Sequence, residues 1–425
     1  MHIQFHYHSL EEIEMTQHLP FSRTPEALLL PISIAGKKLN TRAALQPMEG
    51  TDGTGDGTPD EKTRRRYLRF AAGGAGLIWF EAVSIAPEAQ ASAHQLRLTK
   101  DNLDAFRRLL GEVRETGMRE NGYVPMIIMQ ATHSGRYAKP HGFPEPLISY
   151  NCPPLEDEPI NPGSILSDDD LRRYEDMYGE TARLSQAAGF DGMDIKCCHR
   201  YLASELLSAY TRNGLYGSSL ENRSRFLKNA YRAAKSAISG DFFLTSRINI
   251  YDGFPHPYGF GVDKEGLTPD YTEPINVIGE LYREFRIPLI NITMGNPYKN
   301  PHVNRPYDHG DYVPAEHPLF GERRMMEGVA AVQKALPQLP VLGSAFSYLR
   351  QYAPNLAAGM IEQGNCALAG FGRLALAYPD FIRDLKREGA LNPQKVCIAC
   401  GGCAQLLRAG KPAGCVVRDK EVYSL

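Results

Sequence analysis

Short apolar or β-rich runs recur along the chain, and polar segments with helical spacing separate them. The eight runs cover residues 41–47, 76–83, 124–130, 191–196, 242–249, 288–293, 340–345 and 366–370. Residues 168–188 predict one intervening helix, because Leu171, Tyr174, Tyr178 and Thr181 recur at helical spacing and Asp168 or a neighbouring aspartate can cap it. Strand and helix therefore alternate throughout.

The alternation predicts an α/β fold. Near-continuous apolar strands such as VPMIIMQ, residues 124–130, are typical of a parallel sheet whose outer face is covered. Eight strand–helix units are also the number that closes into a barrel. We therefore predict a (β/α)8 TIM barrel over residues 25–390, preceded by an N-terminal arm over 1–24. A doubly wound open sheet fits the alternation almost as well, so specific residues must decide.

Three loops are longer than a minimal barrel needs, at residues 131–167, 251–273 and 297–318. Each follows a predicted strand. In a barrel they would lie at the carboxyl ends of the strands, where active sites are built, so we expect them to form substrate walls. The alternative is that they only decorate the surface.

The composition is that of a soluble globular protein and predicts neither nucleic acid nor an anionic membrane as a partner. Of its 425 residues 43% are hydrophobic and 23% charged, and the formal net charge is −2. This charge predicts no general attraction to nucleic acid or an anionic membrane. No stretch approaches the roughly 20 apolar residues that span a bilayer, so we expect a cytoplasmic protein.

Four of the eight cysteines crowd into residues 391–425, which we predict to be a metal-binding extension. Cys397, Cys400, Cys403 and Cys415 follow the pattern C-x2-C-x2-C-x11-C. Three closely spaced thiolates and one distant thiolate are typical of a [4Fe–4S] cluster. Zinc is the alternative, although its sites more often pair two separate C-x2-C turns. The remaining cysteines, Cys152, Cys197, Cys198 and Cys366, are expected to be buried thiols.

Four motifs resemble the old yellow enzyme family, and more closely its iron–sulfur branch, which contains 2,4-dienoyl-CoA reductase and trimethylamine dehydrogenase. They are TRAALQPMEG, GGAGLIWFEAVSIAPE, QATHSGR and FDGMDIKCCHRYLASELLSAYTRNGLYGSSLENRSRF, in the family's order, and the resemblance covers residues 25–420. It implies a barrel that binds FMN. It also implies the FMN contacts Pro47, Met48, Glu49, Ala82, Gln130 and Arg247, with the phosphate held by Gly343, Ser344, Gly372 and Arg373.

The resemblance further implies an ene-reductase. Lys196 and His199 match the pair that holds the substrate carbonyl oxygen, and Tyr201 matches the tyrosine that protonates the carbon opposite the hydride acceptor. The substrate would be an unsaturated carbonyl compound of the dienoyl thioester, steroid or tetrapyrrole type. Arg200, Tyr251 and Tyr298 are candidate substrate contacts.

Three residues depart from the family pattern. Lys196 replaces a histidine, Arg200 a glycine, and Glu49 a small or neutral residue. The added positive charge favours an acidic substrate or one whose enolate needs strong stabilisation. We also expect Glu49 and Lys196 to form an ion pair over the flavin in the empty site.

Electrons must come from elsewhere, because no GxGxxG motif follows a strand near the C-terminus. The donor would be NAD(P)H docking over the FMN, or a separate flavoprotein or ferredoxin reductase feeding the cluster. Two other functions stay open. One is amine oxidation in an aromatic cage of Tyr251, Tyr258, Tyr298 and Tyr307, and the other is a non-catalytic electron-transfer subunit. The subunit count is also open, a homo-oligomer included.

Overall fold

The computed structural model describes residues 1–306, 308–310 and 313–425. Its main sheet has nine parallel strands in the order β7-β6-β5-β4-β3-β11-β10-β9-β8. The strands are β3 (Ala43–Leu45), β4 (Leu77–Ser84), β5 (Met126–Thr132), β6 (Gly192–Ile195), β7 (Phe243–Thr245), β8 (Arg247–Asn249), β9 (Ile290–Thr293), β10 (Val341–Gly343) and β11 (Leu368–Phe371).

The sheet is a closed barrel, because its two end strands are halves of one. Only Ser246 separates β7 from β8; β7 pairs with β6 and β8 pairs with β9. Each of the eight predicted runs overlaps one barrel strand or, at 242–249, contains both halves of one. The predicted (β/α)8 barrel is therefore confirmed, and the alternative of an open doubly wound sheet is wrong.

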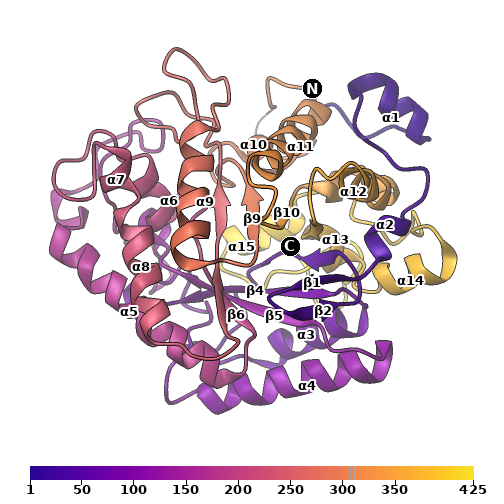
Figure 1. The fold of residues 1–425 in the computed structure, drawn as a ribbon, viewed down its shortest axis with the longest axis horizontal. Helices are drawn as coiled ribbons and strands as arrows, with labels where there is room; N and C mark the ends of the chain where they lie inside the picture. The colour runs from indigo at the N-terminus through magenta and orange to yellow at the C-terminus, as the bar shows by residue number, and fades with distance from the viewer. Residues whose placement is uncertain (307, 311–312) are drawn as a thin grey trace.

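Both faces of the strands are shielded from water. Every residue of β4 and β5 is buried, as expected where side chains fill the barrel on one side and helices cover the other. Figure 1 shows this outer layer of helices around the strands. The helices that follow successive strands are α3 (Glu61–Ala72), α4 (Leu103–Asn121), α5 (Asp168–Ala188), α6 (Leu202–Leu207) with α7 (Leu220–Arg223) and α8 (Arg225–Ser236), α9 (Thr272–Phe285), α10 (Pro301–Asn304) with α11 (Pro318–Ala335), α12 (Ala353–Glu362), and α13 (Arg373–Ala377) with α14 (Phe381–Glu388).

Helix α5 has the bounds that its sequence pattern predicts. Leu171, Tyr174, Tyr178 and Thr181 are all buried, so the predicted apolar face packs inward. The expected aspartate cap is wrong, because Ser167 caps the helix and accepts from the backbone N–H of Asp170. The Asp170 carboxylate accepts in turn from the backbone N–H of Ser167, which completes a capping box.

The N-terminal residues cover two parts of the barrel. The antiparallel pair β1 (Ile32–Ile34) and β2 (Lys37–Leu39) contributes Ile34 and Leu39 to an apolar cluster with residues of the barrel strands. Further upstream, α1 (Leu10–Gln17) packs against α11 and buries Ile13 completely, while α2 (Glu26–Leu29) packs against α12. The arm predicted over residues 1–24 is thus packed on the barrel in this structure.

The C-terminal extension is docked on the barrel by ion pairs and main-chain contact. Asp419 accepts hydrogen bonds from Arg65 at 2.7 and 2.9 Å and from Arg69 at 2.6 Å, both on α3. The backbone N–H of Ala413 donates to the carbonyl of Gly50 at 2.7 Å. These contacts hold α15 (Gly402–Arg408) near α13 and the strand ends (Figure 1).

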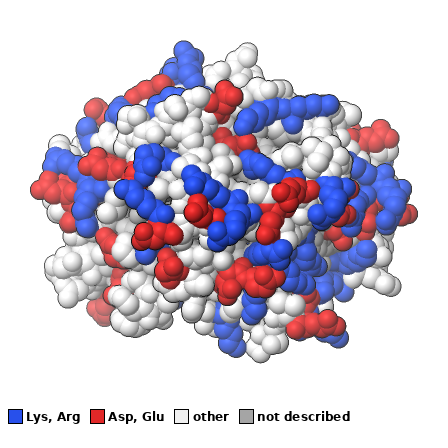
Figure 2. All heavy atoms as spheres, turned by 90° about the horizontal axis from the view of Figure 1, so that it is seen from below, with Lys and Arg blue, Asp and Glu red and all other residues white. Residues whose placement is uncertain are grey.

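Charges of both signs are interspersed over the face that Figure 2 shows. This distribution agrees with the formal net charge of −2. Among residues 1–306, 308–310 and 313–425, no helix combines the length and the apolar character that crossing a bilayer requires.

Candidate active site

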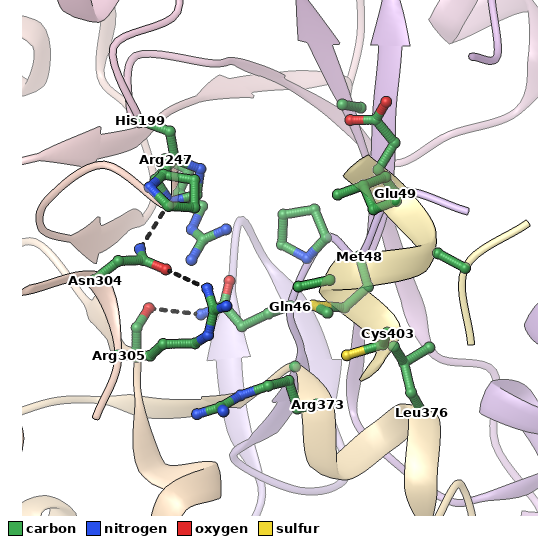
Figure 3. Close-up of a pocket in the computed structure, with 18 of the residues that line it drawn as sticks. Gln46, Met48, Glu49, His199, Arg247, Asn304, Arg305, Arg373, Leu376 and Cys403 are labelled. Atoms are coloured by element: carbon green, nitrogen blue, oxygen red, sulfur yellow. Dashed lines mark hydrogen bonds between the residues drawn. The ribbon is translucent and has the colours of Figure 1, made fainter. Parts of the chain in front are cut away.

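A cavity of about 1220 Å³, including its open mouth, lies at the carboxyl ends of the barrel strands. Active sites of TIM barrels occupy this face. The cavity collects most of the predicted site residues, and Figure 3 shows several of them. Those that line it are Pro47, Met48, Glu49, Ala82, Gln130, Lys196, His199, Tyr201, Arg247, Tyr298, Ser344, Gly372 and Arg373.

Several predicted residues lie outside the cavity. Gly343 ends β10 but does not line the wall, which its neighbour Ser344 does. Tyr251 is 5% exposed, donates to the carbonyl of Leu267 and does not line the cavity, so the structure does not bring it to the predicted substrate site. The aromatic cage is not assembled either, because Tyr258 is also absent from the lining. Tyr307 lies outside the described residues.

The structure places the Arg200 side chain away from the cavity, where substrate contact was predicted. Its side chain is fully buried and donates to Asp252, to the carbonyl of Tyr258 and to the hydroxyl of Tyr150, each at 2.9 Å. His199 and Arg200 have φ angles of +64° and +62°, a region that non-glycine residues rarely adopt. The buried guanidinium thus fixes the strained turn at residues 199–200, and with it the positions of the neighbouring residues His199 and Tyr201.

We expect Arg200→Met to destabilise the folded protein strongly. The change leaves the carboxylate of Asp252 buried without its cation, which typically costs about 3–5 kcal/mol. Adding Asp252→Asn should recover part of this loss, since the remaining group is then neutral. Urea unfolding of both variants measures the effect, with Arg183→Met as control because Arg183 pairs with Glu180 at the surface of α5. A double variant no more stable than Arg200→Met would contradict the pairing.

One end of the cavity offers a fixed amide and a buried cation. Gln130 donates from Nε2 to Asp194 at 2.6 Å, which leaves its amide oxygen to accept. Asp194 also accepts from Trp79 Nε1 at 2.8 Å and from the backbone of Arg247 at 2.7 Å. The Arg247 side chain makes one long contact, 3.5 Å to Thr293, and its Nε has no partner among the described residues. The guanidinium therefore retains donors for a ligand.

The opposite end suits an anion. Gln46 donates to the hydroxyl of Ser344 at 2.9 Å, and that hydroxyl donates to the carbonyl of Ile292 at 2.7 Å, so the loop after β10 is fixed. Within the described residues no group accepts from the backbone N–H of Ala345 or Gly372. Arg373 adds a cation that is 9% exposed. A Cβ at Gly372 would lie 2.8 Å from Met48 Sδ, so the flexible Met48 side chain would have to shift to admit a larger residue.

The predicted catalytic residues meet along one wall. His199 Nε2 lies 3.0 Å from Asn304 Nδ2, a donor from the loop after β9 (Figure 3). Burial and the nearby cations Arg247, Lys196 and Arg305 hold the pKa of His199 well below its usual range, so the ring is neutral. Lys196 Nζ lies 3.6 Å from the centre of the Tyr201 ring. The Tyr201 hydroxyl lies 3.1 Å from that of Tyr298.

The expected ion pair between Glu49 and Lys196 is wrong. No carboxylate of the described residues lies within 4.0 Å of Lys196 Nζ, which rests on the Tyr201 ring instead. In Figure 3 the Glu49 carboxylate lies across the cavity from Arg247 and His199. Burial raises the pKa of Glu49 to about 7, against the opposing effect of Lys196 and with a further rise from Glu81. Glu49 is therefore close to its midpoint of ionisation at neutral pH.

The four clustered cysteines surround a second, smaller cavity. Cys397, Cys400, Cys403 and Cys415 line a space of about 350 Å³ next to Arg373. Backbone N–H groups of Ala399 and Arg418 donate to the sulfurs of Cys397 and Cys415 at 3.4 and 3.3 Å. In the described chain, no three His, Cys, Asp or Glu side chains converge closely enough to hold a single metal ion. Cys403 lines both this cavity and the larger one.

Residues that the sequence did not single out complete the large cavity. They are Gln46, Asn304, Arg305 and Arg408, among others. Asn304 and Arg305 come from the long loop at 297–318, which was expected to form a substrate wall, so only its position after a strand could have indicated them. The loop at 251–273 contributes no residue to the lining.

Comparison with known proteins identifies relatives of this barrel. The chain is 29% identical to an NADPH dehydrogenase of Geobacillus thermodenitrificans over 55% of this chain and 66% of that protein. It is 25% identical to an NADH oxidase of Thermoanaerobacter brockii over 86% of this chain but only 51% of the relative. The chain thus spans about half to two thirds of the length of these relatives.

Solved structures share the fold. A 2-naphthoyl-CoA reductase in complex with 2-naphthoyl-CoA matches with a TM-score of 0.75 and 21% identity, over 92% of this chain and 57% of the other. A histamine dehydrogenase from Rhizobium sp. 4-9 matches with a TM-score of 0.70 and 18% identity, over 93% of this chain and 53% of the other. The profile of the NADH:flavin oxidoreductase / NADH oxidase family matches residues 27–263. Because this match covers more than half of the chain and the fold is a barrel, the chain belongs to that family, the old yellow enzyme family of FMN-dependent oxidoreductases.

Proposed function

We propose that this enzyme reduces the activated C=C bond of an unsaturated carbonyl compound. The proposal rests mainly on three neighbouring groups in the cavity wall. They are the neutral imidazole of His199, the ammonium group of Lys196 and the phenol of Tyr201. A hydrogen-bond donor, a cation and a proton donor are the groups that such a reduction needs.

Each side chain on that wall has one task. Bound FMN supplies the hydride that the β-carbon of the alkene accepts. Lys196 and His199 hold the carbonyl oxygen and stabilise the negative charge that it gains. Tyr201 breaks its O–H bond and gives the proton to the α-carbon, so that hydride and proton together saturate the double bond. The phenolate left on Tyr201 lies beside the Lys196 cation, which limits the cost of its charge.

The wall residues also fit FMN. The free amide oxygen of Gln130 suits a donor on the flavin pyrimidine edge, and the unsatisfied donors of Arg247 suit its N1 and O2 acceptors. Arg373, with the free N–H groups of Ala345 and Gly372, suits the phosphate.

Arg373→Ala should weaken FMN retention while the barrel stays folded. The change removes the cation from the phosphate end, and each tenfold loss of affinity corresponds to about 1.4 kcal/mol of binding free energy. Equilibrium dialysis of the flavin measures the affinity, and far-ultraviolet circular dichroism checks the fold. Arg383→Ala, a change on the exposed face of α14, is the matched control. Equal FMN affinity in the two variants would count against this phosphate site.

We propose that the four cysteines bind a [4Fe–4S] cluster. Their C-x2-C-x2-C-x11-C spacing is typical of such a cluster, and in the described chain they line one space without converging on a single point, which suits a polynuclear group better than one zinc ion with sulfur ligands at about 2.3 Å. Backbone N–H donors to Cys397 and Cys415 also fit, because hydrogen bonds to sulfur tune such clusters. NAD(P)H at the flavin or a protein donor at the cluster would supply the electrons.

Amine oxidation is the second candidate, because histamine dehydrogenase shares the fold. The charges of this cavity argue against it, since Lys196, Arg247, Arg305 and Arg373 all line it and would repel a cationic amine. Anaerobic stopped-flow mixing separates the two functions. Reduced enzyme should be reoxidised by 2-cyclohexen-1-one, and oxidised enzyme should not be reduced by trimethylamine. Flavin reduction by the amine, without reoxidation by the enone, would reverse the assignment.

A further inference from the structure

A third cavity of about 920 Å³, its open mouth included, adjoins the large cavity proposed to hold FMN, here called the flavin cavity, on the side of Tyr298. Its wall includes Thr51, Tyr137 and Lys139, and it reaches the surface at the exposed residues His94, Gly142 and Gly410. Four residues line both cavities: Glu49, Tyr298, Leu407 and Arg408. Tyr298 therefore forms part of the partition between the two cavities, and water can reach this partition from the surface through the third cavity.

The partition is fixed in place by specific contacts. The Tyr298 ring stacks on Tyr137 with ring centres 4.0 Å apart. Its backbone N–H donates to the side chain of Asn296 at 2.7 Å, and Asn296 donates in turn to the hydroxyl of Tyr137 at 2.5 Å. The Tyr298 hydroxyl therefore stays at its distance of 3.1 Å from the Tyr201 hydroxyl.

Water has no direct path to Tyr201 while bound FMN and substrate fill the flavin cavity that Tyr201 lines. Its side chain is 3% exposed, it does not line the third cavity, and Lys196 covers its ring. The proposed reaction leaves a phenolate at Tyr201 after each turnover, and a buried phenolate is unfavourable, as its strongly raised pKa shows. The proton must be replaced through a neighbour, and Tyr298 is the hydroxyl in contact with it.

We propose that Tyr298 is a second catalytic tyrosine, which relays protons from the third cavity to Tyr201. This inference rests on the proposed ene-reduction. As the O–H bond of Tyr201 breaks toward the substrate carbon, the Tyr298 hydroxyl donates to the Tyr201 oxygen and passes it a proton. Water in the third cavity then protonates Tyr298, and the hydroxide left behind is neutralised by the buffer. No electron moves in the relay.

The charged groups that face the pair come from four elements. They are Lys196 after β6, Glu49 after β3, Glu81 of β4, which acts through Glu49, and Arg408 of α15. Glu49 disfavours either phenolate when it is ionised, whereas Arg408 and Lys196 favour it. The relay should therefore be slower where Glu49 is charged, above about pH 7.

Tyr298→Phe tests the relay, because it keeps the ring stack and removes only the hydroxyl. Reduced enzyme is mixed anaerobically with 2-cyclohexen-1-one in H2O and in D2O, and flavin reoxidation is followed. We expect the variant to be slower by roughly tenfold or more, with a larger solvent isotope effect, because general acid catalysis depends on the proton supply. Tyr251→Phe is the control, because this change also removes a buried tyrosine hydroxyl but at a position outside the three cavities described.

Rescue separates a relay from a structural role. Imidazole is small enough for the third cavity and can donate a proton there, so it should accelerate Tyr298→Phe and leave the wild-type rate unchanged. Two results would overturn the relay while leaving ene-reduction intact. In the first, Tyr298→Phe is reoxidised as fast as Tyr251→Phe. In the second, Tyr298→Phe is slow, but imidazole does not accelerate it and its solvent isotope effect is not larger than that of the wild type. A wild-type enzyme that the enone cannot reoxidise would instead overturn the proposed reaction, and the relay with it.

Discussion

Tyr201→Phe should slow reoxidation of the reduced flavin by an enone by about 100- to 10,000-fold, the range that general acid catalysis typically contributes. The variant keeps the aromatic ring on which Lys196 rests, so the cation and the cavity shape should persist. Flavin reduction by the electron donor should change little, because no proton from this residue is needed in that half of the cycle. Anaerobic stopped-flow absorbance measures both halves separately.

The contrast between the two halves is the decisive part of that measurement. Equal slowing of reduction and reoxidation would indicate that Tyr201 only positions the flavin. Tyr251→Phe again serves as the control for loss of one buried tyrosine hydroxyl. Unaltered reoxidation in Tyr201→Phe would remove the proton donor from the proposed mechanism and reopen amine oxidation.

Cys400→Ser should deplete the purified protein of iron and acid-labile sulfide while most of the FMN stays bound. Cys400 lines the cysteine cavity but not the flavin cavity, so its loss removes a ligand without changing the flavin wall. Iron and sulfide analysis of anaerobically purified protein, with its visible spectrum, measures the result.

Cys366→Ala is the control for that variant, because Cys366 is a buried thiol just before β11 and outside the cysteine cavity. It should retain the full iron content. Stoichiometric zinc and no iron in the wild-type protein would show that the cysteine cavity holds a different metal. Loss of FMN together with iron in Cys400→Ser would show that the two cavities do not load independently.

The barrel could be predicted from the sequence because its signal is local and repeated. Runs such as residues 124–130 are apolar on both faces, and a buried parallel strand requires that pattern wherever it lies. The bounds of α5 followed for the same reason, since an apolar face at helical spacing depends on few neighbours. The cap of α5 was missed because Ser167 and the aspartates after it are all acceptable caps, and only the geometry of the turn chooses between them.

The site was predicted best where a residue lies in a barrel strand or directly after one. Gln130, Lys196 and Arg247 follow from the strand pattern and the family motifs together, and all three line the cavity. Arg200 shows the limit: an arginine in a motif at the barrel mouth suggests a ligand contact, yet Asp252 and the carbonyl of Tyr258 turn it away from the cavity. Those partners lie about 50 residues further along the chain, and no local pattern indicates them.

The Glu49–Lys196 pair failed for a related reason. Both residues end strands on the same face, which places them near one cavity but does not fix the direction of long side chains. Lys196 has a closer partner in the face of Tyr201, five residues further along the chain. The attraction between an ammonium group and an aromatic ring is modest, so Lys196 can leave the Tyr201 ring to contact a substrate carbonyl oxygen. This agrees with the proposed role of Lys196.

Helix α15 is only seven residues long, and its side chains border all three cavities. Cys403 lines the cysteine and flavin cavities, Ala404 lines the flavin cavity, and Leu407 and Arg408 line both the flavin cavity and the third cavity. Inserting or deleting a residue within this helix would rotate its later side chains by about 100°, since an α-helix has 3.6 residues per turn. A change in the length of this helix would therefore alter both the placement of Cys403 relative to the other cysteines and the shape of the flavin-cavity wall. The length of this one helix can thus change only if both sites are rebuilt at once.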